Sequence, residues 1–199
     1  EMCKMIHRAY DQKLFTSTQG TFSQRLDDNS FLITPYGIDR KYMDVSDIVR
    51  IDGNMKEAGK TPSRSVMLHR YIYEKQAHIN AVLIAHPPSI MSFAVTDTPF
   101  DSKIIPESYI MLRDILKLPF GCSFMQPELT AGEFSKSVPI ALIENDCIVV
   151  TGDSLINAFD RLEVAEYSAK GIISAKSIGD IVMIDNNKIK EIEKAYNLE

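Results

Sequence analysis

The chain has 199 residues, of which 45% are hydrophobic and 25% charged, a composition typical of a water-soluble globular protein. Its net charge is −5, and no stripe of Lys and Arg with interleaved aromatic residues occurs, which argues against nucleic acid as a partner. The longest apolar runs are shorter than the roughly 18 residues of a membrane helix, and the first residues are too charged for a secretory signal. We therefore expect a cytoplasmic protein that does not contact a membrane.

The sequence contains no linker rich in Pro, Gly or Ser and no internal repeat, so we expect a single domain over residues 1–199. Its three cysteines, Cys3, Cys122 and Cys147, are odd in number and far apart, and none forms a CxxC pair. This spacing argues against a disulfide framework and against a thiolate zinc site. We interpret the cysteines as small buried hydrophobic residues.

The first part of the chain predicts a helix followed by a β-hairpin. Apolar residues recur at near-helical spacing over residues 2–15. Residues 22–26 and 31–34 then predict two strands, and the Asp-Asp-Asn-Ser sequence at 27–30 predicts the turn between them.

Two glycine loops flank this hairpin, one at Gly20-Thr21 and the other at Gly37. We expect the two loops to lie near each other and to offer backbone N–H groups to an anion. An ordinary turn is the alternative interpretation of each loop.

Residues 44–47 predict a single helical turn, and residues 48–52 predict a strand that ends at Gly53-Asn54. A helix is then predicted with Thr61 as N-cap and Pro62 at its first position, where the missing N–H is harmless. His69 lies on the apolar stripe of this helix, which indicates a buried core histidine.

The stretch at the centre of the chain changes character at His86. Residues 79–85 are apolar and rich in β-branched residues, which favours a strand buried on both faces. Pro87 and Pro88 end that strand and suit the start of a helix over residues 89–95. Because such corners often carry chemistry, His86 is a candidate metal ligand or proton donor. The alternative is a corner histidine whose ring satisfies a backbone group.

The second half of the chain predicts strands alternating with helices. In chain order these are a helix at 106–116, a strand at 120–124, a helix at 130–136 capped by Thr130, strands at 139–144 and 147–151, a long helix over 155–173 capped by Asp153 or Ser154, and a short charged helix after Gly179.

Four segments, in this order and spacing, resemble the class II aldolase/adducin family. They are TQGTFSQR at 18–25, FLITPYGI at 31–38, PSRSVMLH at 62–69 and IENDCIVVTGDSLINAFDRLEVAE at 143–166. The resemblance extends from about residue 5 to residue 173. It implies an α/β fold, a three-layer α/β/α sandwich around a largely antiparallel central sheet, and a homotetramer with active sites at subunit interfaces.

The resemblance also implies where a metal would bind. Enzymes of this family hold zinc with a His-x-His pair at the end of the central strand and a third histidine before a glycine. Here those three positions read Ile84, His86 and Asp146. Because isoleucine cannot bind a metal, His86 and Asp146 remain as ligands for a divalent metal that is bound weakly or not at all. The alternative, which we favour for Asp146, is a carboxylate that accepts backbone N–H bonds in a tight connection between strands.

The catalytic position of the family is changed as well. Its general acid/base glutamate falls on Ser65, which has no useful pKa near neutrality. Glu107 is the nearest spare carboxylate that a pocket could recruit, although the N-terminal charge of a helix is the interpretation we favour for it.

The phosphate-binding positions of the family survive in part. Those that match are Gly20, Gly37 and Ser63, those that differ are Thr21 and Tyr36, and Arg64 lies beside Ser63 in the same segment. The resemblance therefore implies a small phosphorylated sugar or a similar anion as ligand. Two classes of function stay open: an aldehyde-lyase acting on a sugar phosphate or related hydroxy-carbonyl compound, with activity altered or lost, and a non-catalytic, adducin-like assembly or ligand-binding subunit.

Overall fold

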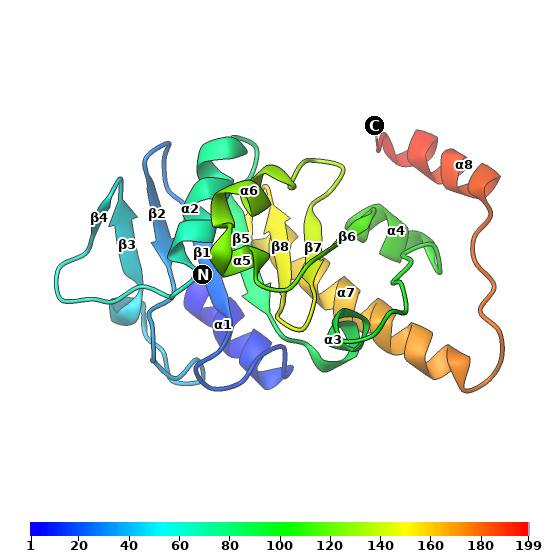
Figure 1. Ribbon diagram of the computed structural model, residues 1–199, viewed down its shortest axis with the longest axis horizontal. Coiled ribbons are helices and arrows are strands. Elements are labelled where there is room, and N and C mark those ends of the chain that lie inside the picture. The colour runs from blue at the N-terminus through cyan, green and yellow to red at the C-terminus, as the bar shows by residue number, and fades with distance from the viewer. Residues whose placement is uncertain (199) are drawn as a thin grey trace.

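A computed structural model describes residues 1–198, and its described part contains an eight-stranded sheet (Figure 1). The strands are β1 (Thr21–Arg25), β2 (Ser30–Ile33), β3 (Val49–Asp52), β4 (Met55–Lys56), β5 (Ala81–Ala85), β6 (Ile115–Leu118), β7 (Ile140–Ile143) and β8 (Ile148–Gly152). Their spatial order is β4-β3-β2-β1-β5-β8-β7-β6. Neighbouring strands are antiparallel except β6 and β7, which are parallel. The expected, largely antiparallel sheet is confirmed.

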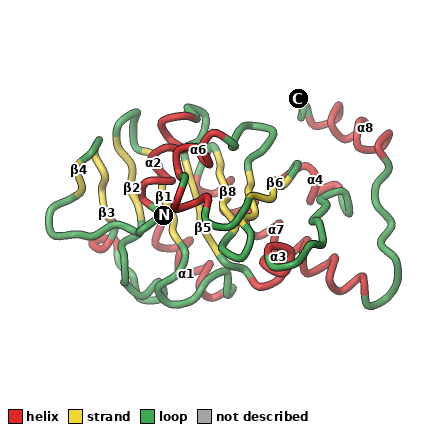
Figure 2. Tube along the Cα trace, viewed as in Figure 1, coloured by secondary structure: helices red, strands yellow, loops and turns green. Residues whose placement is uncertain are grey.

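Helices cover both faces of this sheet (Figure 2). They are α1 (Met2–Asp11), α2 (Val66–Lys75), α3 (Pro88–Ala94), α4 (Pro106–Leu112), α5 (Cys122–Met125), α6 (Pro127–Gly132), α7 (Leu155–Lys176) and α8 (Asn186–Tyr196), with a 3₁₀ turn at Val45–Asp47. One face packs against α1, α3 and α7, and the other against α2 and α6. The three-layer α/β/α arrangement is confirmed.

The central strand β5 shows why the sheet needs both layers. Ala81, Leu83 and Ala85 belong to the core on the α7 side, whereas Val82 and Ile84 belong to the core on the α2 side. All five residues are buried, as the apolar run predicts. Successive side chains point to opposite faces, so the residue after the strand, His86, shares the α2 side with Ile84.

The predicted helix start at Thr61 and Pro62 is wrong. Pro62 forms an isolated bridge with Pro35, and the Ser63 N–H donates to the carbonyl of Thr34 at 3.0 Å. These pairings extend the backbone along the end of β2, so α2 begins four residues later, at Val66. The extended segment carries Ser63 toward the loop around Tyr36.

Three predicted elements between residues 106 and 136 are wrong in type or bounds. The helix ends at Leu112 because Arg113 adopts φ 55° and ψ −137°, and β6 follows where the helix was expected to continue. Residues 120–124 do not form a strand: left-handed Gly121 precedes the short helix α5. The next helix begins at Pro127 and contains Thr130 instead of being capped by it.

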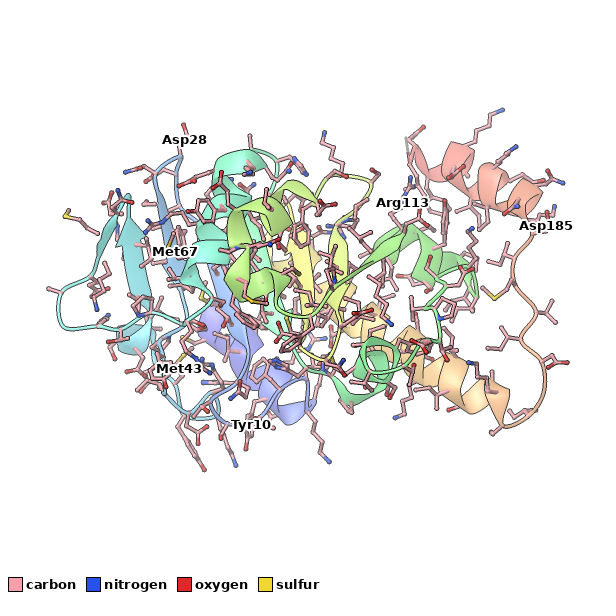
Figure 3. All side chains as sticks on the ribbon, viewed as in Figure 1. Tyr10, Asp28, Met43, Met67, Arg113 and Asp185 are labelled. Atoms are coloured by element: carbon pink, nitrogen blue, oxygen red, sulfur yellow. The ribbon has the colours of Figure 1, made fainter. Side chains whose placement is uncertain are left out.

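The predicted terminal helix is present as α8, which an extended segment separates from α7 (Figure 1). Figure 3 marks Arg113, after α4, and Asp185, at the start of α8. The Tyr109 hydroxyl of α4 donates to Glu193 Oε1 at 2.6 Å, and Ile189 of α8 is buried. Among residues 1–198 no helix is both long enough and apolar enough to cross a membrane.

Candidate functional site

A cavity of about 500 Å³ opens on the α2 side of the sheet, where β5 ends and β1 and β8 begin. Met67 of α2, labelled in Figure 3, is one of its lining residues. The predicted site residues that line the cavity are Gly20, Thr21, Tyr36, Gly37, Ser63, Arg64, Ser65, His86 and Asp146. Residues from both halves of the chain therefore meet in one site.

The two glycine loops lie together, as expected, and the buried side chain of Arg40 joins them. Both Gly20 (φ 76°) and Gly37 (φ 73°) adopt the left-handed conformation that favours glycine. Arg40 is 2% exposed, and its Nη2 donates to the carbonyls of Gly20 at 3.1 Å and Pro35 at 3.0 Å. Burial lowers the Arg40 pKa to about 10, so a positive charge stays beneath both loops at neutral pH.

Three hydroxyl groups form a cluster on the wall of the cavity. The Oγ1 of Thr21 lies 2.7 Å from Ser63 Oγ and 3.2 Å from Ser65 Oγ, and the two serine oxygens are 3.1 Å apart. In the sheet Thr21 is paired with Ile84 of β5, so this cluster lies beside the end of the central strand. The hydroxyls can donate hydrogen bonds to an anion, but they cannot act as a carboxylate base.

Arg64 adds a cationic side chain to the same part of the cavity. Its guanidinium lies 5.5 Å from the centroid of the Tyr36 ring, which is 53% exposed. Stacking of this kind orients a guanidinium. The forked N–H groups of the guanidinium suit phosphate or carboxylate oxygens. Arg64 and the hydroxyl cluster can therefore bind an anionic group together.

His86 lies at the corner between β5 and α3. Its backbone N–H donates to the carbonyl of Leu14 at 2.9 Å, and Glu166 of α7 accepts the N–H groups of Ser89 and Ile90 at 2.9 to 3.1 Å. The ring Nδ1 is buried and has no hydrogen-bond partner within residues 1–198. Burial lowers the pKa of His86, although the charge of Asp146 acts in the opposite direction, so the imidazole is neutral at pH 7.

Asp146 lies in the tight connection between β7 and β8. The preceding residue, Asn145, has φ 52°, and the Asp146 N–H donates to the carbonyl of Ile143 at 3.2 Å. Its Oδ2 accepts the Ser123 hydroxyl at 2.6 Å, which connects α5 to this turn. Burial and then Asp146 raise the pKa of the neighbouring Cys147 thiol well above 9.0, so this thiol is protonated and a poor nucleophile.

The residues at the end of β5 do not fit the three-histidine zinc site of the resemblance. Ile84 is 7% exposed and places an alkyl group in the cavity, two residues before His86 on the same face. Within residues 1–198 no group of three His, Cys, Asp or Glu side chains could hold a metal ion. Because Asp146 is already bonded to Ser123, His86 and Asp146 do not form a ligand set for tight binding.

Glu107 is not brought to this cavity. It lies in the first turn of α4, where an acidic side chain complements the helix dipole, and it is not one of the lining residues. The position agrees with the favoured interpretation of Glu107 as a helix charge.

Among the lining residues that the sequence does not single out, Arg40 and Ser123 make hydrogen bonds that hold the site together. Arg40 belongs to no recognisable motif, and its burial depends on both loops closing over it. Ser123 was placed in a predicted strand, so its bond to Asp146 could not be anticipated. The three cysteines are free; Cys3 and Cys147 are buried, whereas Cys122 is half-buried.

The sequence model of the Class II Aldolase and Adducin N-terminal domain matches residues 1–173. The chain belongs to this family. The match covers the whole sheet and α1 to α6, together with most of α7, and ends before α8.

Relatives within the class II aldolase and adducin family carry more than one name. The L-fuculose phosphate aldolase of Methanococcus vannielii is 29% identical over 170 residues, covering 85% of this chain and 92% of the relative. The 3-oxo-tetronate 4-phosphate decarboxylase of Haemophilus influenzae is 24% identical, covering 97% of this chain and 95% of the relative. The crystal structure of YgbL from Klebsiella pneumoniae has a TM-score of 0.83 at 21% identity, covering 96% and 95% of the two chains, and supports the fold.

Proposed function

We propose that this chain binds a small phosphorylated sugar or related hydroxy-carbonyl compound in the cavity and has lost zinc-dependent aldol cleavage. The observation that carries this proposal is that one part of the cavity has groups suited to an anion, whereas another part lacks a complete set of metal ligands. The hydroxyl cluster and Arg64 meet at the glycine loops, whereas the ligand set at the end of β5 is incomplete.

The ligand class is supported by charge and by hydrogen bonding. Arg64 and the buried Arg40 supply positive charge, and Thr21, Ser63 and Ser65 supply hydroxyl donors. Phosphate oxygens are strong acceptors that match such donors. The relatives named above, an aldolase of a sugar phosphate and a decarboxylase of a phosphorylated keto acid, also have phosphorylated ligands in their names.

The remaining part of the cavity would hold the carbon skeleton of the ligand. Ile84 offers an apolar contact there, and the neutral His86 can exchange a hydrogen bond with a hydroxyl or carbonyl. With Ser65 at the acid/base position, no carboxylate is available in that place to move a proton. We therefore expect binding with weak or no cleavage of standard sugar phosphates.

Calorimetric titration with L-fuculose 1-phosphate and dihydroxyacetone phosphate would test the ligand class. Replacing a charged hydrogen-bond partner costs about 1.5–3 kcal/mol, so we expect Arg64→Ala to weaken binding at least about tenfold. Arg50→Ala is the matched control, because Arg50 is an exposed residue of β3 and does not line the cavity. Equal affinities in the wild type and Arg64→Ala would contradict the assignment, and so would rapid cleavage accompanied by stoichiometric zinc.

We also propose that the chain assembles as a cytoplasmic homo-oligomer, most simply a tetramer. An apolar group beside the cavity is exposed: Phe120, Phe124, Met125 and Leu129 are each 56–66% exposed. Contiguous exposed apolar surface commonly marks an interface, and closed symmetry is the usual outcome for identical chains. Light scattering should give a multiple of 22.4 kDa; a stable monomer at micromolar concentration would refute this proposal.

A further inference from the structure

A second cavity, of about 380 Å³, lies at the other end of the central strands. It is lined by His78 and Ile79, which precede β5, and by residues 151–153, where β8 ends. His86 and Asp146, in contrast, follow β5 and precede β8. The two cavities are therefore separate, and the site described above makes no use of the second one.

Four carbonyl groups on the wall of the second cavity are already hydrogen-bonded. The bonds are Arg161 Nη1 to Thr151 O (2.6 Å), Asn80 N to Gly152 O (2.8 Å), Asn80 Nδ2 to Asp153 O (2.9 Å), and both N and Oγ1 of Thr151 to Pro139 O (2.9 and 2.8 Å). These four acceptors are thus already used and less available to a ligand that donates hydrogen bonds.

The donors of the second cavity, in contrast, are largely uncommitted. His78 Nε2 is buried and has no hydrogen-bond partner within residues 1–198. Arg161 donates through Nε and Nη1, so its Nη2 has no partner in that same range, although the charge of Asp153 acts on this guanidinium. Lys136 is exposed and forms none of the ion pairs among the described residues. The one carboxylate among the lining residues is Asp153, which accepts the Ser154 hydroxyl at 2.9 Å. Such an excess of donors and positive charge is complementary to an anion.

His78, Lys136 and Arg161 all line this second cavity. Burial lowers the pKa of His78, and the charges of Lys136, Arg161 and Arg25 lower it further. The imidazole is therefore neutral at pH 7 and can donate one N–H without adding charge. Of the three cations, Lys136 and Arg161 share the cavity wall with His78, whereas Arg25 lies outside it.

At one wall of this cavity, β8 and α7 pack closely against each other. A Cβ atom at Gly152 would lie 2.6 Å from the backbone nitrogen of Ala158, so a side chain there would force β8 and α7 apart. Arg161 holds the same region by donating to the carbonyls of Thr151 and Met111. This part of the cavity wall is thus held in place by contacts within the protein.

We propose that this second cavity is an anion site that binds a small phosphate-type dianion, either inorganic phosphate or the phosphate group of a small metabolite. The volume accommodates a phosphate carrying a short carbon chain, and it lies within the usual range of about 300–1,000 Å³ for small-molecule pockets. Lys136, His78 and Arg161 Nη2 would donate to its oxygens.

The test uses calorimetric titration in the Arg64→Ala background, which removes the main cation of the first cavity. Inorganic phosphate and glycerol 3-phosphate are the two probes, and the better binder identifies the source of the phosphate. We expect Arg64→Ala to retain phosphate binding, and the further change Lys136→Ala to weaken it about tenfold. Arg161 is left intact, because its replacement would remove the donor to two part-buried carbonyl groups.

Lys56→Ala in the same background is the matched control, because Lys56 is an exposed residue of β4 that lines neither cavity. His78→Gln is a second variant and should also weaken binding. The inference is overturned if Lys136→Ala and Lys56→Ala bind phosphate equally, or if Arg64→Ala binds no phosphate. The sugar-phosphate comparison with and without Arg64→Ala is repeated in the Lys136→Ala background, where the second cavity contributes little, so the two proposals fail independently.

Discussion

The two parts of the main cavity differ in how their polar groups are supported. At the glycine loops each hydroxyl of Thr21, Ser63 and Ser65 has a hydroxyl neighbour, and Arg40 fixes the backbone from below. At the end of β5, His86 Nδ1 has no partner among the described residues, and an alkyl group stands beside it. The difference supports our proposal that the chain has groups for holding an anion but lacks a ligand set for a metal.

Rebuilding the metal ligands should give the largest effect. Ile84→His together with Asp146→His would place three imidazoles where the family holds zinc, and three histidines form a typical catalytic zinc site. We expect zinc content, measured by mass spectrometry of the purified protein, to rise from substoichiometric to about one ion per chain. Adding Ser65→Glu should then restore measurable aldol cleavage.

The control for this change is Ile84→Gln with Asp146→Asn, which alters polarity at the same two positions without adding imidazole ligands. Failure of the histidine variant to gain zinc would mean that the backbone around His86 has moved too far from the family geometry. The contrast between the two parts of the cavity would then lie in the backbone and not in the side chains.

The glycine loops allow a matched pair of substitutions with a smaller effect. Gly20 and Gly37 have nearly equal φ angles, but a Cβ at Gly20 would lie 2.5 Å from the Phe15 ring, whereas nothing lies within 4 Å at Gly37. Chemical denaturation should show Gly20→Ala destabilised by about 2–4 kcal/mol, from left-handed strain plus overpacking. Gly37→Ala should lose about 1–2 kcal/mol, from strain alone. Equal losses of unfolding free energy in the two variants would show that the Phe15 ring moves to accommodate the new methyl group.

The buried histidine behind the hydroxyl cluster predicts a loss of stability in acid. His69 is fully buried, its Nδ1 lies 2.6 Å from Ser23 Oγ, and burial lowers its pKa from 6.5 to about 3. Between these pH values the unfolded chain binds a proton that the folded chain does not, so stability falls as pH decreases through 6.5. The loss from pH 7 to pH 5 should be about 2 kcal/mol from this group.

Urea denaturation at the two pH values would measure this loss, with His69→Gln as the variant that cannot titrate. The variant should show a pH dependence smaller by about the same amount. If both proteins lose stability equally between pH 7 and pH 5, the acid sensitivity comes from other groups. Protonation of His69 in the folded protein would then have no effect on the free energy of unfolding.

Patterns within short segments predicted much of the fold. The apolar run at 79–85 gave the central strand, and the helical spacing after Ser154 gave α7, whose N-cap oxygen accepts the Asn157 N–H at 3.3 Å. His69 was predicted to be buried from its place on one stripe of α2, and it is. In these cases the local sequence and the tertiary packing favour the same conformation.

The errors arise where a long-range pairing decides the conformation. Pro62 suits the start of a helix, but its bridge with Pro35 holds it extended. The strand β6 depends on parallel pairing with β7, more than twenty residues later, which no local pattern reveals. In the site, the family positions led to the cavity, whereas Arg40 and Ser123 depend on tertiary contacts that a sequence alone does not specify.

Because the positive charge of Arg40 beneath the glycine loops does not change near neutral pH, the pH dependence of binding reports the ionisation state of the ligand. Arg40 keeps its proton up to about pH 10, and the hydroxyls of Thr21, Ser63 and Ser65 do not ionise in the neutral range. The second ionisation of a phosphate monoester occurs near pH 6. An affinity for the phosphate ligand that increases as pH rises through 6 would therefore show that the cavity prefers the dianion over the monoanion.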